Sequence, residues 1–455
     1  MCYTESENLS GVVFTAEIKL WGMSVRIKTK ELSYDKVMTL PPDIHKKPRK
    51  QSVLFRKLVH LLSLWDLWRV HFSYEENGME RLDKNQPCLI LMNHSSFIDL
   101  EIVGKLFADR SYQIVCTLDG LVGKKWLMRM LGCIPTKKFM MDMALIRDMI
   151  YAVKKLNSSI VMYPEASYSF DGTATPLPDS LGKCLKLLEV PVVMVRTYGA
   201  FQRDPLYNGL RRRKIRVSAE VKYLLSPDDI QNKNPQELNK ILQKEFEFDH
   251  FQWQLKNQVP IREKFRAEGL NRVLYKCPSC LAEGNMKGYG TKLICQDCGR
   301  EYEMTEYGQM LATEGETEIP HIPDWYRWER ECVRKELMDG TYRLDVPVDI
   351  YMMVNTKCVY KVGTGNLLHT EEGFHLKGCD GKLDYHQAPG TSYSLYSDFF
   401  WYEIGDMICI GNAEAQYYCF PKVERDLVAK ARLAAEELYK LSKLTKRKKN
   451  IQNKG

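Results

Sequence analysis

A histidine and an aspartate that follow a short apolar run could perform general-base catalysis. The run CLILM, residues 88–92, is followed by the segment NHSSFID, which contains His94 and Asp99. These two residues are five positions apart, which on one continuous helix would separate them by about 140° around the axis. We therefore expect His94 in a turn and Asp99 in the first turn of a helix. There the carboxylate would fix one ring nitrogen and leave the other basic.

Two other residue pairs could be mistaken for catalytic groups, and we interpret both as non-catalytic. His375 and Asp380 repeat the same spacing, but no buried strand precedes them and no partner motif accompanies them, so the repeat is interpreted as coincidence. Ser95 and Ser96 have no second base and acid nearby in sequence. We expect these serines to shape the turn and cap the helix instead of acting as nucleophiles.

Four cysteines form a second chemical pattern. Cys277 and Cys280 make one Cys-x-x-Cys pair, Cys295 and Cys298 make another, and 14 residues separate the pairs. This interval is one residue shorter than is usual for a zinc ribbon, in which four thiolates complete a tetrahedral Zn²⁺ and leave no open position. We predict structural zinc. Ribbons can also bind nucleic acid, but the intervening loop has only two lysines, so no nucleic-acid partner is expected.

The elements that position the histidine have an alternating order. From Pro87 onward, short apolar runs alternate with helical patterns, which predicts an α/β core with a largely parallel sheet. Chemistry in such sheets collects at the carboxyl ends of the strands. After the cysteines, many short strand-like segments precede one long Ala/Leu/Lys/Glu helix. That pattern is similar to a small pleckstrin-homology-like domain with a terminal helix.

The N-terminal part is expected to contact a membrane surface. Residues 11–34 alternate apolar and charged side chains, which predicts a β-hairpin. A helical pattern follows, preceded by a basic cluster, and its apolar positions are Leu54, Leu58, Leu61, Leu62, Trp65, Trp68 and Phe72. Such a helix could lie on anionic lipid, with its tryptophans at headgroup level, or pack on its own domain.

The charge distribution agrees with a lipid or phosphate partner. The formal net charge is +8, and basic residues cluster at 46–57, 211–216 and 446–449. Anionic lipid headgroups, phosphorylated substrates, nucleic acid or plain solvent could face such clusters. The sequence contains neither a signal-peptide pattern nor an apolar run of bilayer length. We therefore expect a cytoplasmic protein that is peripheral on the inner face of the membrane.

Four blocks between about residues 85 and 200 carry a family resemblance. NHSSFID (93–99), GCIPTKK (132–138), YPEASYS (163–169) and VPVVMV (190–195) occur in this order. They resemble the four motifs of the glycerolipid acyltransferases, the family that contains lysophosphatidic acid acyltransferases. The resemblance implies an acyltransferase α/β core and a fatty acyl transfer from acyl-CoA or acyl carrier protein to a lysophospholipid hydroxyl.

The resemblance also implies roles for individual residues. His94 would be the general base, Asp99 would orient it, and Glu165 would bind the glycerol part of the acceptor, unless its carboxylate only caps a turn. Lys137, Lys138 and Ser167 would complete the acceptor site. The third block departs from the family, because Ala166-Ser167-Tyr168 stands where Gly-Thr-Arg is usual. The arginine expected to hold the acceptor phosphate is absent, so the acceptor headgroup is open, and the 211–216 cluster could hold the phosphate instead.

The sequence thus predicts four parts and leaves rival functions open. The expected parts are a hairpin and interface helix (1–75), an acyltransferase domain (76–270), a zinc ribbon (271–305) and a β-rich domain with a terminal helix and basic tail (306–455). The same His–Asp pair could serve a lipid or thioester hydrolase if water replaced the alcohol. The altered third block could also belong to a non-catalytic scaffold on the membrane.

Overall fold

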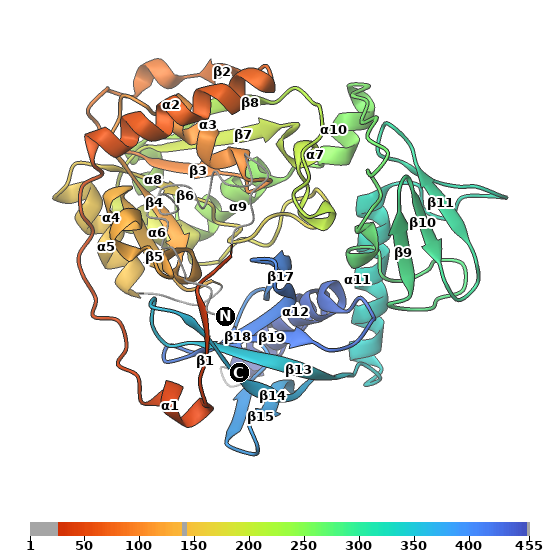
Figure 1. Ribbon diagram of the computed structural model, residues 1–455. Coiled ribbons are helices and arrows are strands. Elements are labelled where there is room, and N and C mark those ends of the chain that lie inside the picture. The colour runs from red at the N-terminus through yellow and green to blue at the C-terminus, as the bar shows by residue number, and fades with distance from the viewer. Residues whose placement is uncertain (1–25, 139–142, 453–455) are drawn as a thin grey trace, which may run out of the picture.

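The computed structural model describes residues 26–138 and 143–452. They form three sheets in chain order: a seven-stranded sheet, a four-stranded sheet and an eight-stranded sheet. Figure 1 shows the seven-stranded sheet above the C-terminal sheet, with the small four-stranded sheet to one side. The helix α11 (Ile322–Met338) stands between the small sheet and the rest of the molecule.

The first sheet is the predicted parallel core. Its order is β2-β8-β7-β3-β6-β4-β5, and every neighbouring pair is parallel except β7 with β8. Its strands are β2 (Ser73–Asn77), β3 (Leu89–Met92), β4 (Tyr112–Thr117), β5 (Cys133–Thr136), β6 (Ser159–Met162), β7 (Val192–Tyr198) and β8 (Ser218–Leu225). The apolar runs recognised in the sequence therefore become the central strands.

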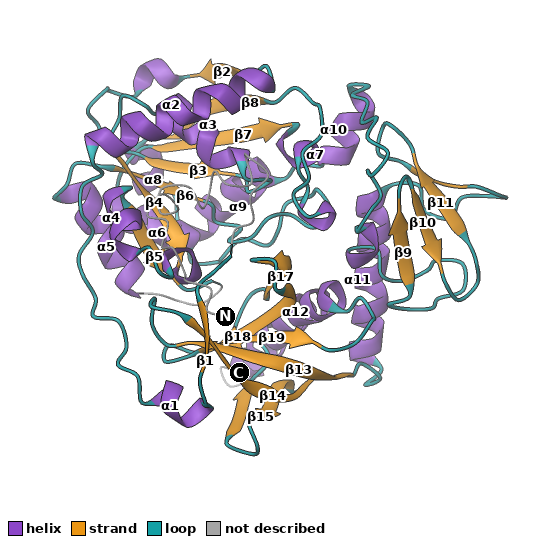
Figure 2. Ribbon diagram, viewed as in Figure 1, coloured by secondary structure: helices purple, strands orange, loops and turns teal. Residues whose placement is uncertain are grey.

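Helices cover both faces of this sheet (Figure 2). They are α2 (Val53–Arg69), α3 (Ile98–Leu106), α4 (Lys125–Met130), α5 (Met143–Lys154), α6 (Leu181–Leu188), α7 (Ala200–Arg203), α8 (Pro227–Asn232), α9 (Pro235–Phe246) and α10 (His250–Lys256). In β3, Leu89 and Leu91 pack into one core with α5, α6 and α9, whereas Ile90 and Met92 pack into another with α2 and α3. A strand buried on both faces must be apolar throughout, which explains the uninterrupted CLILM run.

The helix α2 buries two polar side chains and leaves much of its apolar surface exposed. Ser63 and Asp66 are buried beside α3, where the Asp66 carboxylate pairs with the guanidinium of Arg203. The outer face of α2 carries exposed apolar side chains, namely Val53, Leu54, Leu61, Leu64, Trp65 and Trp68. The predicted amphipathic helix is therefore present between residues 53 and 69, but most of its apolar stripe faces away from the protein.

The N-terminal segment joins the C-terminal sheet. Most of the hairpin predicted over residues 11–34 lies outside the described residues. Its described end includes β1 (Thr29–Glu31), which pairs in parallel with Val359–Lys361. The short helix α1 (Tyr34–Met38) follows. The described part of this segment thus contacts the far end of the chain, a pairing that the local sequence pattern did not indicate.

The four-stranded sheet contains the cysteine pairs. Its antiparallel order is β12-β11-β10-β9, with strands β9 (Met286–Tyr289), β10 (Lys292–Cys295), β11 (Glu301–Met304) and β12 (Met310–Ala312). Because β12 pairs with β11, this sheet continues past the boundary expected at residue 305. The indole N–H of Trp325 in α11 donates to the Lys276 carbonyl, which fixes α11 against the start of this region.

The C-terminal region is β-rich and ends in a helix, as predicted. Its sheet has the order β16-β15-β14-β13-β19-β18-β17, with β1 added beside β14. Its strands are β13 (Leu344–Met353), β14 (Val359–Thr370), β15 (Gly373–Gly378), β16 (Leu383–Gln387), β17 (Tyr396–Trp401), β18 (Gly405–Gly411) and β19 (Gln416–Pro421), followed by α12 (Val428–Gln452). The resemblance to a pleckstrin-homology domain stays a prediction. None of the helices within the described residues is both long and apolar enough to span a bilayer.

Candidate active site

His94 and Asp99 meet at the carboxyl end of β3. His94 lies in the turn after the strand, and Asp99 lies in the first turn of α3. The His94 Nδ1 is 3.1 Å from Asp99 Oδ2, and because a carboxylate only accepts, the ring N–H is the donor. Such a contact leaves Nε2 as the basic nitrogen. The backbone N–H groups of Ser95 and Ser96 also donate to Asp99 Oδ2, at 2.8 and 3.1 Å.

Two tyrosines from the third sequence block pack on the imidazole. The centroids of the Tyr163 and Tyr168 rings each lie 4.3 Å from the centroid of the His94 ring. Tyr168 occupies the position where the family usually has arginine, so this chain replaces a cation with a ring that contacts the histidine. With these neighbours the His94 side chain is 24% exposed, which restricts how the ring can turn.

His94 lines a largely apolar cavity. Its volume is about 530 Å³, and its lining includes Leu100, Val115, Ile146, Met149 and Leu187 from the sheet and its covering helices. Tyr163 and Tyr168 also line it, as do Lys137 and Lys138. An elongated apolar group attached to a polar reacting centre fits such a lining.

A second cavity, which we call the interdomain cavity, also opens on His94. Its volume is about 410 Å³, and it lies between the parallel-sheet domain and the C-terminal sheet. The segment from β17 to β18 forms one wall with the aromatic side chains Tyr396, Phe399, Phe400, Trp401 and Tyr402. His94, Lys138 and Tyr168 line both cavities. The histidine therefore stands where the two cavities meet.

Glu165 holds the loop that carries His94. Its Oε2 accepts the backbone N–H of His94 at 2.8 Å, and its Oε1 accepts the backbone N–H of Thr175 at 2.8 Å. Burial raises the pKa of Glu165 to about 7, although both N–H contacts favour the charged form. Glu165 is not among the residues that line the two cavities. The capping alternative accounts for these contacts, and the predicted contact with the acceptor stays a prediction.

The other predicted acceptor-binding residues are distributed around the cavities. Lys137 Nζ donates to the backbone carbonyls of Asn412 and Ala413. Lys138 Nζ lies 3.9 Å from the centre of the Tyr396 ring, and burial lowers the pKa of this lysine.

Ser167 and the basic cluster at 211–216 have other partners. Ser167 lines the interdomain cavity and accepts a hydrogen bond from Arg432 Nη2 at 3.0 Å. In the cluster, Arg211 pairs with Glu268, and Arg213 is buried with its Nη2 donating to the Tyr207 hydroxyl. No residue of that cluster is among those lining the two cavities at His94. The phosphate contact considered for this cluster from the sequence stays a prediction.

The second His–Asp spacing has no catalytic geometry. His375 Nε2 contacts Asp384 Oδ1 at 2.5 Å, and Asp380 lies in a turn with a positive φ of 56°. The His375 pair is on the C-terminal sheet and lines neither cavity at His94.

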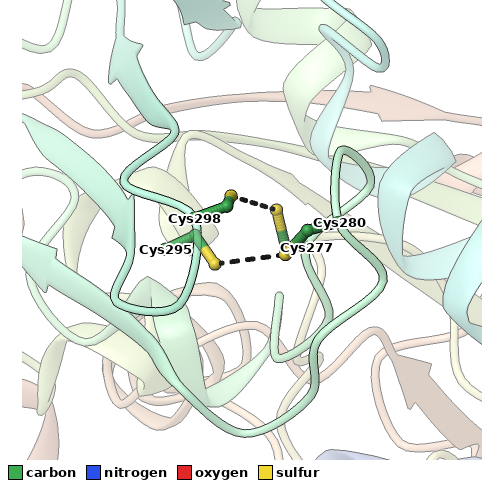
Figure 3. Close-up of side chains that lie close together, drawn as sticks. All are labelled: Cys277, Cys280, Cys295 and Cys298. Atoms are coloured by element: carbon green, nitrogen blue, oxygen red, sulfur yellow. Dashed lines mark hydrogen bonds between the residues drawn. The ribbon is translucent and has the colours of Figure 1, made fainter.

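The four predicted ligand cysteines come together (Figure 3). Their sulfur atoms all lie within 4.8 Å of one another, with 3.8 Å between the Sγ atoms of Cys277 and Cys298 and 3.7 Å between those of Cys280 and Cys295. These separations are far too long for disulfide bonds. A tetrahedral ion with metal–sulfur bonds of about 2.3 Å has sulfur–sulfur edges of about 3.8 Å. The cluster could therefore hold a metal ion.

Sequence reasoning missed the part of the site supplied by the C-terminal region. The aromatic segment from Phe399 to Tyr402 is visible in the sequence, but nothing local indicates that it reaches a histidine about 300 positions earlier. The packing of Tyr163 and Tyr168 on His94 was also missed, although both residues belong to a recognised motif.

Comparison with known proteins identifies the domain around His94. The model of the acyltransferase family matches residues 73–197. No curated protein matches the chain. Among solved structures, the chain is similar to the 1-acyl-sn-glycerophosphate acyltransferase of Thermotoga maritima, with 16% sequence identity and a TM-score of 0.34. That match covers 42% of this chain and 78% of the other.

Proposed function

Because residues 73–197 form a domain of the acyltransferase family, we propose that the chain transfers a fatty acyl group from acyl-CoA or acyl carrier protein to a lysophospholipid hydroxyl. The observation that carries the proposal is the 3.1 Å contact between His94 Nδ1 and Asp99 Oδ2 beside a largely apolar cavity of about 530 Å³. It provides a fixed base next to space for an acyl chain.

The reaction needs few protein groups because a thioester is already activated. His94 Nε2 removes the proton of the acceptor hydroxyl while that oxygen attacks the thioester carbonyl. The C–S bond then breaks, and the thiolate takes the proton back from the imidazolium. The products are an ester and a free thiol, without a covalent enzyme intermediate. Asp99 stabilises the imidazolium, and Glu165 keeps the histidine loop in place as a positioning residue.

The direct test is thiol release from a long-chain acyl-CoA, or from acyl carrier protein, with and without lysophospholipid acceptors. We expect release that requires an acceptor and yields its acylated product. Release of free fatty acid without acceptor would replace the proposal with a thioester hydrolase. No release with either donor and any acceptor would replace it with a non-catalytic scaffold.

We also propose that the outer face of α2 rests on a membrane containing anionic lipid, on its cytoplasmic side. Leu54, Trp65 and Trp68 are 74%, 58% and 67% exposed, and the two indole rings stack at 5.4 Å. Water is a poor solvent for such a face, whereas the bilayer interface accommodates it. The neighbouring Lys46, Lys47, Arg49 and Lys50 are exposed and would face acidic headgroups.

Replacing Trp65 and Trp68 together with alanine is expected to weaken binding to anionic vesicles about tenfold or more, because both indoles lose their apolar contact. Co-sedimentation measures the binding. The thermal midpoint should stay unchanged, since neither side chain is buried. Tyr289→Ala, at a 73% exposed position in the ribbon, is the control. Equal vesicle binding by the double variant and the unaltered protein would contradict the proposal.

We propose zinc as the metal of the four-cysteine cluster. Four thiolates within 4.8 Å of one another suit Zn²⁺ and would leave no position open for substrate, so the ion would be structural. None of these cysteines lines either of the two cavities at His94, so acyl transfer would not involve the ion.

A further inference from the structure

The interdomain cavity has the charges and rings of a site for a zwitterion. Among its lining residues, Lys124 and Lys138 are basic, whereas Asp119, Asp398 and Glu403 are acidic. The formal balance is therefore one negative charge, from two cations and three carboxylates. A bare phosphate monoester, which is close to a dianion, would meet net repulsion there. A phosphate that carries a cation would find partners for both of its charges.

The aromatic wall is suited to the cationic part. Tyr396, Trp401 and Tyr402 lie at the β17–β18 end, and ring faces attract ammonium groups, including quaternary ones. This wall already holds one internal cation, because Lys138 Nζ lies 3.9 Å from the centre of the Tyr396 ring. The Tyr396 hydroxyl and the Trp401 indole N–H both donate to Asp119 Oδ2, which fixes a carboxylate beside the rings.

The position of the cavity connects it to the reaction. His94 lines both cavities, so an acceptor hydroxyl at the histidine could have its headgroup in the interdomain cavity while the acyl donor occupies the apolar one. Tyr168 lines the same cavity at the position where a phosphate-binding arginine was expected from the sequence. A tyrosine at that position and a cavity wall of carboxylates and aromatic rings both favour a headgroup with a cation over a bare phosphate.

We propose that the interdomain cavity binds the headgroup of an acceptor whose phosphate carries an ammonium group, as in choline or ethanolamine lysophospholipids. Lys138 contacts the phosphate, while Glu403 and the Tyr402 ring contact the ammonium. The C-terminal region is then part of the acceptor site and determines specificity. This inference rests on the proposed acyl transfer, because it names the acceptor class of the same site.

The first experiment compares kcat/KM of the full-length protein for lysophosphatidic acid and for choline and ethanolamine lysophospholipids of equal chain length. We expect at least about a tenfold preference for the ammonium acceptors. Glu403→Gln and Tyr402→Leu should each reduce that preference about three- to tenfold, whereas Tyr402→Phe, which keeps the ring, should retain it. Glu372→Gln makes the same change at an exposed turn outside the cavity and should have no effect.

A binding experiment separates this inference from the proposed function. Calorimetry with sn-glycero-3-phosphocholine and sn-glycerol 3-phosphate needs no turnover. Tighter binding of the choline compound, lost in Tyr402→Leu and kept in Tyr402→Phe, supports the site even if no acyl transfer is found. Binding of the choline compound no tighter than that of glycerol phosphate, or an equal or higher kcat/KM for lysophosphatidic acid, overturns it.

Discussion

Replacing His94 with alanine is expected to lower acceptor-dependent thiol release about 10²- to 10⁴-fold, which is the usual contribution of a positioned general base. The loss should appear in kcat, because the imidazole acts on the hydroxyl proton as the C–O bond forms. KM for the acyl donor should change little, since the apolar cavity that would hold the chain has many other lining residues. Steady-state kinetics with one accepted lysophospholipid measures both.

Two further variants decide whether the effect comes from the His–Asp pair. Asp99→Asn keeps the side-chain size but removes the charge that accepts the Nδ1 proton and two backbone N–H groups, so kcat should also fall strongly. His375→Ala removes the other histidine with the same sequence spacing, and its kcat should match the unaltered protein. A His94→Ala protein that folds and retains full acceptor-dependent release would exclude the general-base role.

The core and the contact between His94 and Asp99 could be predicted because their signals are local. Both faces of β3 are buried in apolar cores, so the strand must be an uninterrupted apolar run. His94 and Asp99 are only five positions apart, and the turn after the strand brings their side chains into contact. The cysteine pairs could be predicted for the same reason. In each pair only two residues separate the cysteines, so a short turn brings their two sulfur atoms close together.

What could not be predicted depends on contacts between distant parts of the chain. The inward side of α2 includes the buried Asp66–Arg203 pair, whose members are 137 positions apart. β1 reaches the C-terminal sheet by pairing with β14, about 330 positions later. The wall formed by Phe399–Tyr402 belongs to the site only through domain packing. Periodicity identifies such elements, but it contains no information about their partners.

The largest expected effect on stability concerns the four-cysteine cluster. The purified protein should contain about one zinc ion per chain, and Cys277→Ser or Cys295→Ser should lose the ion and lower the thermal midpoint. Structural zinc in isolated zinc-finger peptides contributes about 10–16 kcal/mol of binding free energy. The loss of stability should extend beyond the ribbon, because Cys277, Cys295 and Leu293 belong to the same buried cluster as Trp325 of α11 and the C-terminal strands.

Elemental mass spectrometry and thermal unfolding, each with and without a strong chelator, measure the two effects. Cys332→Ser is the matched control, since Cys332 lies on α11 outside the four-sulfur cluster and should change neither the zinc content nor the response to chelator. The exposed ligands Cys280 and Cys298 make chelation feasible without prior unfolding. A protein free of metal that melts at the same temperature with intact thiols would show that the cluster is held by the ribbon's own packing. A fall of the midpoint in Cys277→Ser but not in Cys332→Ser, together with loss of zinc, assigns the stability to the ion.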